Sequence, residues 1–342
     1  MKKSIKVWFL SLLFCFVLAP AVKADAAENL PKRRVDNGTE DIKMNSNVAV
    51  DQLGATGTYA GGYIYNLKQT GATVNSVTIS WSAASGATGY YVVAVDDYGY
   101  ITNTLRTLTG TSVTLTLPEQ TYEYGIGVIP YDANGYSTAS GDVIDVYTTP
   151  KKLSGLKIYG YFASSNKLSV VWNDSVCYGF EAYCYNKKGK QVDCVDTSYY
   201  HAATFSKSNT QNVYTVKVRP YVYINGTQKL YGEFSDVLYA VPQPKITSKN
   251  KDVKANSVNL KWKKVNGASK YEIYISSKKS GGYKKVATVK SSKKSYKITK
   301  FGKKKLSTTK TKYIKIVTYA KFGKKTKKSQ SNAQLSARTY YY

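Results

Sequence analysis

Few residues in this chain are of the types that carry out catalysis. His201 is the only histidine among 342 residues, whereas a nucleophile–base pair or a zinc site ordinarily uses histidine. Tyr199 and Tyr200 come directly before it, so no glycine-rich turn presents a nucleophile there. We therefore expect a protein that is not an enzyme and that needs no metal and no cofactor.

Three cysteines follow the first 24 residues: Cys177, Cys184 and Cys194. An odd number allows at most one intramolecular bridge. Cys184 and Cys194 flank the segment 186–190, which has the composition of a hairpin loop, and a short loop centred on Gly189 would place the two cysteines opposite each other. The pattern leaves two alternatives, which are a cross-strand disulfide between Cys184 and Cys194 or thiols that stay unpaired.

Lysine gives the strongest chemical signal in the sequence. The chain holds 50 Lys and Arg against 21 Asp and Glu, a formal net charge of +29. Residues 245–342 contain 29 of the basic residues and only two acids, Asp252 and Glu272, which gives this segment a charge of +27, whereas residues 25–244 carry −2. A field of this strength attracts polyanions. Lysine, a compact point charge, suits diffuse attraction better than the bidentate recognition that arginine provides.

The first 24 residues have the pattern of a secretory signal peptide. Lys2, Lys3 and Lys6 precede an apolar run of 12 residues at 7–18, and small residues at 22–24 offer a cleavage site. The run is too short to span a bilayer, which takes about 20 residues, and no other long apolar stretch follows. We expect an exported protein in which residues 25–62, mixed in charge and rich in Gly and Asn, form a disordered linker.

The rest of the chain repeats itself with a period of about 90 residues. Trp81, Trp172 and Trp262 are 91 and 90 residues apart, and each ends a run in which apolar and polar residues alternate, the pattern of a half-buried strand. The segment from Trp81 through Gly86-Ala87 to Tyr90 recurs from Trp262 to Tyr271, while the middle copy keeps only an aromatic residue, Phe180. The predicted units are 63–149, 150–242 and 243–342, with proline at the boundaries.

Units of this length with many short strands are typical of two-sheet β-sandwiches. All three resemble fibronectin type III modules of the kind found in secreted and surface proteins of Gram-positive bacteria. The resemblance implies an all-β, immunoglobulin-like fold in which the three tryptophans are core residues. It also implies that Tyr124 and Tyr214 are corner tyrosines, whereas the third unit has Lys312 at that position.

The topology implied by this resemblance places the lysine clusters at both ends of the third unit. One end would hold the B–C, C′–E and F–G turns, and the other the C–C′ and E–F turns. The residues that we predict to bind a polyanion are Lys263, Lys264, Lys278, Lys279, Lys303, Lys304, Lys305, Lys324, Lys325, Lys327 and Lys328.

The nearest polyanions to an exported bacterial protein are anionic polymers of the cell envelope and acidic glycans. We therefore expect a secreted, envelope-associated binding or spacer protein that attaches through its third unit. One alternative is a carbohydrate-binding protein in which Tyr98, Tyr100, Tyr183 and Tyr185 stack on sugar rings; aromatic residues on one continuous face would favour it. A second alternative is binding of extracellular nucleic acid, since attraction to its phosphate backbone requires no sequence motif. A third is binding of another surface protein. The sequence does not specify an oligomeric state.

Overall fold

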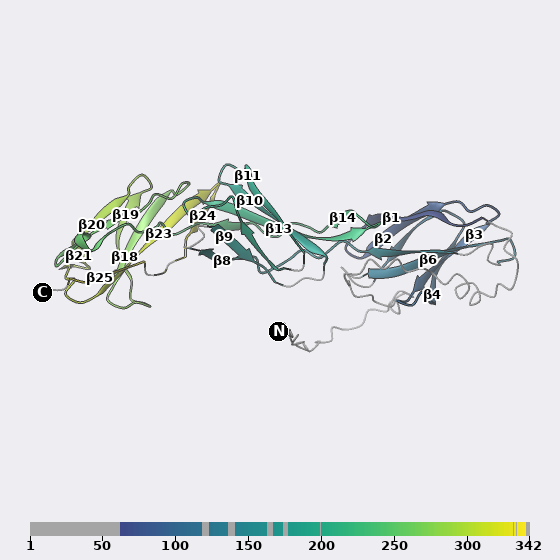
Figure 1. Ribbon diagram of the computed structural model, residues 1–342, viewed down its shortest axis with the longest axis horizontal. Coiled ribbons are helices and arrows are strands. Elements are labelled where there is room, and N and C mark those ends of the chain that lie inside the picture. The colour runs from purple at the N-terminus through teal and green to yellow at the C-terminus, as the bar shows by residue number, and fades with distance from the viewer. Residues whose placement is uncertain are drawn as a thin grey trace, which may run out of the picture.

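The computed structural model describes residues 62–117, 123–135, 141–162, 167–173, 177–198, 200–330, 332 and 334–339. The expected signal peptide and nearly all of the expected linker lie outside these residues. Three β-sandwiches follow one another along the long axis of the molecule (Figure 1). Among the described residues, no helix has the length and apolarity needed to cross a membrane.

Module 1 is built from two antiparallel sheets that face each other. The smaller sheet has the order β1-β2-β5 and the larger the order β4-β3-β6-β7. Their bounds are β1 Tyr65–Ala72, β2 Ser76–Ser82, β3 Gly89–Val95, β4 Ile101–Leu108, β5 Ser112–Thr116, β6 Glu123–Tyr131 and β7 Asp142–Tyr147.

Module 2 repeats this arrangement with sheets of order β12-β9-β8 and β11-β10-β13-β14, and β15 also pairs with β13. The first sheet comprises β8 Lys157–Phe162, β9 Lys167–Val171 and β12 Ala202–Phe205. The second comprises β10 Gly179–Asn186, β11 Gln191–Ser198, β13 Tyr214–Ile224, β14 Gln228–Tyr231 and β15 Leu238–Ala240.

Module 3 has the same plan, with sheets of order β16-β17-β20 and β19-β18-β23-β24, with β25 also on β23 and a short β21–β22 hairpin. The bounds are β16 Val253–Lys254, β17 Ser257–Lys261, β18 Lys270–Ser276, β19 Lys284–Lys290, β20 Ser295–Ile298, β21 Lys300–Phe301, β22 Lys304–Lys305, β23 Lys312–Phe322, β24 Lys325–Lys328 and β25 Leu335–Ala337. A three-residue 3-10 turn, Asn250–Asp252, precedes β16. The expected fold class, tandem all-β sandwiches, is confirmed.

Each sandwich encloses a hydrophobic core that contains one of the repeated tryptophans, and all three indoles are at most 5 % exposed. The Gly-Ala-x2-Tyr segment has a clear structural purpose. The hydroxyl of Tyr90 accepts a hydrogen bond from the Ala84 amide at 3.0 Å, and that of Tyr271 accepts one from the Val265 amide at 2.8 Å. The motif therefore ties the loop after the tryptophan strand to the core, and Phe180 in module 2 has no hydroxyl with which to do so.

The corner position differs among the modules, as the sequence indicates. Tyr214 is buried, and its hydroxyl accepts a hydrogen bond from the amide of Asn209, five residues earlier, at 3.0 Å. In module 3 Lys312 occupies the position and donates instead to Ser277 Oγ at 3.1 Å. The loop before it is held by buried Thr308, whose amide donates to the Ala255 carbonyl at 3.0 Å.

Of the two alternatives for Cys184 and Cys194, the structure has the unpaired thiols. The hairpin loop spans residues 187–189 and is centred on Lys188, because the Asn186 amide bonds to the Lys190 carbonyl. A β-bulge near residue 192 then moves the register by one residue in the opposite sense. Cys184 lies opposite Asp193, and Cys194 opposite Tyr183. Since neighbouring residues of a strand point to opposite faces, Cys184 is buried in the core and Cys194 is exposed, and both are free thiols.

Modules 2 and 3 share part of a core. Val213, just before β13, and Val241, just after β15, are buried in the hydrophobic cluster of module 3, which also contains Trp262. Main-chain hydrogen bonds of Asn266 reinforce the junction. Its main-chain amide donates to the Gln211 main-chain carbonyl at 2.7 Å, and its main-chain carbonyl accepts from the Val213 amide at 3.1 Å. The two modules are therefore joined by packing and by backbone hydrogen bonds as well as by the chain itself.

Candidate functional site

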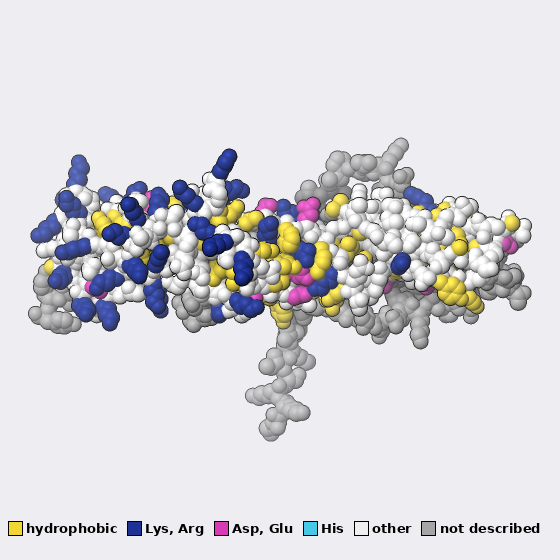
Figure 2. Space-filling model, turned by 90° about the horizontal axis from the view of Figure 1, so that it is seen from above, with side chains coloured by type: hydrophobic (Ala, Val, Ile, Leu, Met, Phe, Trp, Pro, Cys, Tyr) yellow, Lys and Arg dark blue, Asp and Glu magenta, His cyan; other side chains and the backbone are white. Residues whose placement is uncertain are grey.

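All eleven lysines of the predicted polyanion-binding set have exposed side chains. Within the described part of the chain, none of their ammonium groups forms an ion pair with a carboxylate. Figure 2 shows Lys and Arg side chains spread over module 3, at the left of the view, and few of them on module 1 at the right. The lysines thus form a broad cationic surface, which we call the lysine field.

The lysines lie at the two ends of the module that the implied topology indicates. Lys263 and Lys264 are in the β17–β18 loop, which faces module 2, and the β21–β22 hairpin at the far end holds Lys303. The cluster at residues 324–328 differs from the expectation that it lies in a turn, because Lys325, Lys327 and Lys328 belong to strand β24 itself. All four residues of this edge strand are exposed, and charged edges of this kind also discourage pairing with the strands of another chain.

The two acids of module 3 are both withdrawn from its surface. Asp252 is 8 % exposed, and its Oδ1 accepts a hydrogen bond from Lys261 Nζ at 2.6 Å, while its Oδ2 accepts one from the Lys249 amide at 2.9 Å. The hydrogen bond from the Lys249 amide and then that from Lys261 lower the pKa of the Asp252 carboxyl. This carboxylate is therefore charged but turned inward, where it neutralises one lysine.

Glu272, on β18, is the second acid and is 6 % exposed. Its carboxylate accepts hydrogen bonds from Lys270 Nζ at 2.8 Å and from the hydroxyls of Tyr274 and Tyr319 at 2.7 and 2.8 Å. The bond from Lys270, followed by that from Tyr274, lowers the pKa of Glu272 to about 2. Since residues 245–342 contain no other Asp or Glu, the lysine field has no exposed side-chain carboxylate within it.

Module 2 has a related network that is balanced in charge. Glu181, at the position of Glu272, accepts hydrogen bonds from Arg219 Nη2 at 2.8 Å, Lys229 Nζ at 3.1 Å and the Tyr231 hydroxyl at 2.8 Å. Burial alone would raise the pKa of Glu181, but the hydrogen bonds from Tyr183, Arg219 and their neighbours lower it to about 2. Because acids and bases pair here, this face presents little net charge.

The four tyrosines considered for sugar stacking fall into two groups. Tyr98 and Tyr100 are 83 % and 45 % exposed beside the β3–β4 turn of module 1. Tyr183 and Tyr185 lie on β10 of module 2, with their rings parallel and their centroids 6.3 Å apart. This second pair belongs to a continuous aromatic face, but a cation already lies over one of its two rings: the Arg219 guanidinium is 5.5 Å from the ring centroid of Tyr183.

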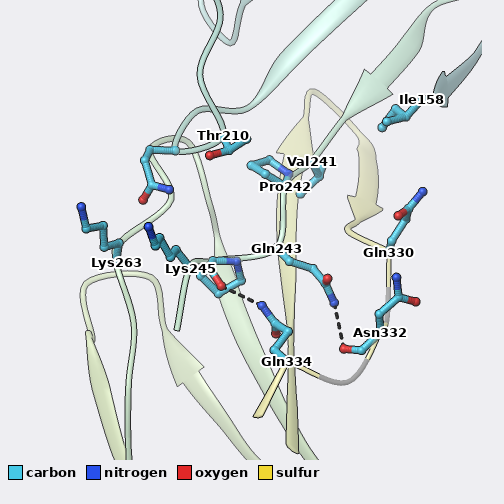
Figure 3. A pocket seen from close by; sticks show the side chains of 12 residues that line it. Ile158, Thr210, Val241, Pro242, Gln243, Lys245, Lys263, Gln330, Asn332 and Gln334 are labelled. Atoms are coloured by element: carbon cyan, nitrogen blue, oxygen red, sulfur yellow. Dashed lines mark hydrogen bonds between the residues drawn. The ribbon is translucent and has the colours of Figure 1, made fainter. Parts of the chain in front are cut away.

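A polar pocket lies between modules 2 and 3, a feature that the sequence did not indicate. Its volume is about 470 Å³. Figure 3 shows Lys245 and Lys263 on one side, Gln330 and Asn332 on the other, and Gln243 between them. Its residues come from loops of both modules and from the linker, so only the folded chain brings them together.

The exposed ammonium groups of the lysine field can bind anions. Among the described residues, no group of three or more His, Cys, Asp and Glu side chains could hold a metal ion. What module 3 offers instead is a set of solvated ammonium groups at both ends and along one edge, which attract anions over about a Debye length, ~8 Å at physiological ionic strength.

Comparison with known proteins gives matches in structure alone. No protein-family profile matches the chain, and no curated protein matches it. A two-module fibronectin type III segment of chicken tenascin is 15 % identical, covering 52 % of this chain and 99 % of its own, with a TM-score of 0.31. The FN1–FN3 domains of chicken CNTN1 are 14 % identical over 81 % of this chain and 99 % of their own, with a TM-score of 0.26.

The central fibronectin-III array of RIM-binding protein is 14 % identical, covering 82 % of this chain and 98 % of its own, with a TM-score of 0.22. In all three modules of the present chain, a sheet built on the tryptophan strand faces a sheet of order C′-C-F-G, which is β4-β3-β6-β7 in module 1, β11-β10-β13-β14 in module 2 and β19-β18-β23-β24 in module 3. The modules have the fibronectin type III fold. This fold serves many unrelated purposes, so function has to be argued from the surface.

Proposed function

We propose that this chain is a non-catalytic, secreted or cell-surface modular protein that attaches to anionic polymers of the bacterial envelope through the lysine field of module 3. Modules 1 and 2 act as a spacer or display a binding surface. The observation that carries the proposal is the segregation of charge within module 3: its candidate lysines are exposed, and both of its acids are buried in ion pairs.

That segregation distinguishes the lysine field from an ordinary solvated surface. Surfaces that serve only solubility carry both signs of charge interspersed. A surface without exposed side-chain carboxylates does not repel a polyanion at any point, but it repels itself, and this self-repulsion costs stability. The arrangement becomes favourable when a polyanion supplies the missing counter-charge.

The distribution of lysines favours a long, flexible polymer over a compact ligand. The clusters lie at opposite ends of the module and along β24, so a single small anion could reach only one of them. A polymer that carries a charge on each repeat could contact several clusters at once, and linked contacts strengthen binding beyond that of each alone.

The proposal is tested by sedimentation of the full chain with bacterial cell walls before and after removal of their anionic polymers. We expect retention on intact walls and loss of retention on stripped walls. Replacing Lys303, Lys304 and Lys305 together by Gln should reduce retention. A matched control replaces Lys188, Lys190 and Lys207 of module 2, which are also exposed, and should leave it unchanged.

Equal retention on intact and stripped walls would contradict the proposal, as would an equal loss from the two triple substitutions. The same assay with added double-stranded DNA addresses the alternative of extracellular nucleic acid. If DNA displaces the protein far more effectively than an equal charge of purified wall polymer, nucleic acid is the better ligand.

A further inference from the structure

We infer that the pocket between modules 2 and 3 is a binding site for a sugar residue that carries one anionic substituent, a carboxylate or a phosphate. The inference deepens the proposed function, because it rests on the chain meeting an anionic glycan and adds a shaped site to the diffuse lysine field. Its volume of about 470 Å³ lies within the range of small-ligand pockets, roughly 300–1,000 Å³.

The charged residues that line the pocket are all basic. Lys245 and Lys263 are exposed and stand together on one wall (Figure 3). The residues that line the pocket include no acid, and within the described residues neither lysine forms an ion pair. An anionic group on the ligand would meet two ammonium groups there and no competing carboxylate.

The rest of the lining matches the other parts of a sugar. Gln243, Gln330 and Asn332 supply amide groups, each of which can donate and accept, as the hydroxyls of a sugar do. Ile158, which is half-buried, supplies apolar surface against which the C–H groups of a sugar ring can pack. This combination of apolar walls and a few polar groups is the usual composition of a ligand site.

One lining residue carries an unmet hydrogen-bonding group. Gln211 Oε1 is buried and has no hydrogen-bond partner among the described residues. A buried acceptor without a partner is unfavourable, because it has given up its hydrogen bonds with water. A turn of the Gln211 side chain toward the pocket would expose Oε1 to a ligand hydroxyl, and donation from that hydroxyl would restore one.

The walls of the pocket are held in place before any ligand binds. Gln334 Nε2 donates to the Pro244 carbonyl at 2.7 Å, while Gln334 Oε1 accepts from the Ile316 amide at 2.8 Å. Gln243 Nε2 donates to the Asn332 carbonyl at 3.2 Å. These bonds hold the linker against module 3, while the shared core and the hydrogen bonds of Asn266 fix module 2 relative to module 3. A ligand would therefore find the site largely formed, and little binding energy would be spent on ordering it.

Adjacent lysines provide a matched pair of variants for the test. Lys263 and Lys264 are both exposed in the β17–β18 loop, but only Lys263 lines the pocket. We would titrate the full chain with digalacturonate and with glucose 1-phosphate by calorimetry, using maltose as the neutral control. We expect saturable one-to-one binding of at least one anionic sugar, weakened about tenfold by Lys263→Gln and less than twofold by Lys264→Gln.

Gln211→Ala should also weaken binding several-fold without unfolding the junction, because the hydrogen bond from Asn266 goes to the Gln211 main-chain carbonyl. The preferred sugar identifies the substituent as carboxylate or phosphate.

Equal losses in the two lysine variants, tight binding of maltose, or tighter binding of a hexaglutamate peptide than of either sugar would overturn the inference. If wall retention depends on the lysine field but neither sugar saturates a site, the inference alone fails; if a sugar saturates the pocket but walls do not retain the chain, the proposed function alone fails.

Discussion

The side-chain amide of Asn225 in module 2 forms hydrogen bonds with both main-chain polar groups of Gln69 in module 1. Its Oδ1 accepts from the Gln69 amide at 3.0 Å, and its Nδ2 donates to the Gln69 carbonyl at 2.9 Å. Asn225 has a φ of +48° and Gly226 one of +83°, conformations that suit the Asn-Gly hairpin turn. The turn between β13 and β14 therefore also docks module 2 onto strand β1.

The side chain of Gln69 in turn bonds to strand β7 of module 1. Gln69 is 3 % exposed, and its side chain bonds to the main chain of Tyr147 in both directions, at 2.7 Å from Nε2 to the carbonyl and at 2.9 Å from the amide to Oε1. With the shared core at the other junction, the three modules form an extended rod (Figure 1). A rod suits the proposed role of a spacer, which would hold module 1 away from the polymer that we propose module 3 binds.

We predict that Asn225→Asp loosens this junction. Aspartate suits the same turn but lacks the Nδ2 donor, and its carboxylate would face the Gln69 carbonyl. The docking should weaken by about 1–3 kcal/mol, the cost of losing one hydrogen bond and leaving a polar group unsatisfied. Small-angle scattering should then show a broader distribution of shapes. Asn134→Asp, in the corresponding Asn-Gly turn of module 1, is the control, and identical scattering from both variants would count against the docking role.

The stability of module 3 should depend on the charge of Glu272. Its folded pKa of about 2 lies below its ordinary value of 4.5, so its contribution is present above pH 4.5 and is lost as the pH falls toward 2. We expect a loss on the order of 2 kcal/mol, followed as faster hydrogen exchange in β18. Glu272→Gln should be less stable at pH 6 and should lack this acid dependence, whereas Glu181→Gln should change module 2 only. An unchanged acid profile in Glu272→Gln would show that another group is responsible.

Attachment through the lysine field should be insensitive to pH. Residues 245–342 contain no histidine, and lysine as a residue type ordinarily stays charged to about pH 9 or above. Binding of the full chain to dextran sulfate, whose own charge is constant, should therefore change less than twofold between pH 5.5 and 8.5. A fall of tenfold within that range would mean that a titrating group outside the lysine field controls binding.

The two thiols of the β10–β11 hairpin should react very differently. Burial raises the pKa of the Cys184 thiol to about 12, and Cys184 lies in the core, whereas Cys194 is exposed. A maleimide should label Cys194 in the native protein without prior reduction and Cys184 only after unfolding, as peptide mapping would show. If Cys194 were labelled only after reduction, the disulfide would exist after all; Cys194→Ser serves as the control for peptide assignment.

Much of the fold followed from the sequence because its signals are local. The three tryptophans, the alternating runs and the tyrosines that follow them define strands without reference to tertiary contacts. The positions of the lysine clusters at the ends of module 3 followed from strand order, although three lysines lie on β24 rather than in its turn.

Other structural features depend on contacts between residues far apart in the sequence, so the sequence alone did not predict them. Asn225 and Asn134 belong to identical Asn-Gly dipeptides, yet within the described part of the chain only Asn225 bonds to a neighbouring module. The loop centred on Lys188 and the bulge near residue 192 together place Cys184 and Cys194 on opposite faces of the hairpin without altering the hydrophobic pattern. The pocket between modules 2 and 3 needs residues nearly 180 positions apart in the sequence, from Ile158 to Gln334.

The salt dependence of binding is the sharpest test of whether the lysine field attaches the chain to an anionic polymer. The affinity of the full chain for purified wall polymer would be measured from 50 to 500 mM NaCl. We predict a linear and steep fall of log K with log salt, as released counterions require. Replacing Lys303, Lys304 and Lys305 by Gln should make the slope shallower by roughly one unit for each lysine that contacts the polymer. Binding that barely changes with salt, or a slope that the triple substitution leaves unaltered, would contradict the claim.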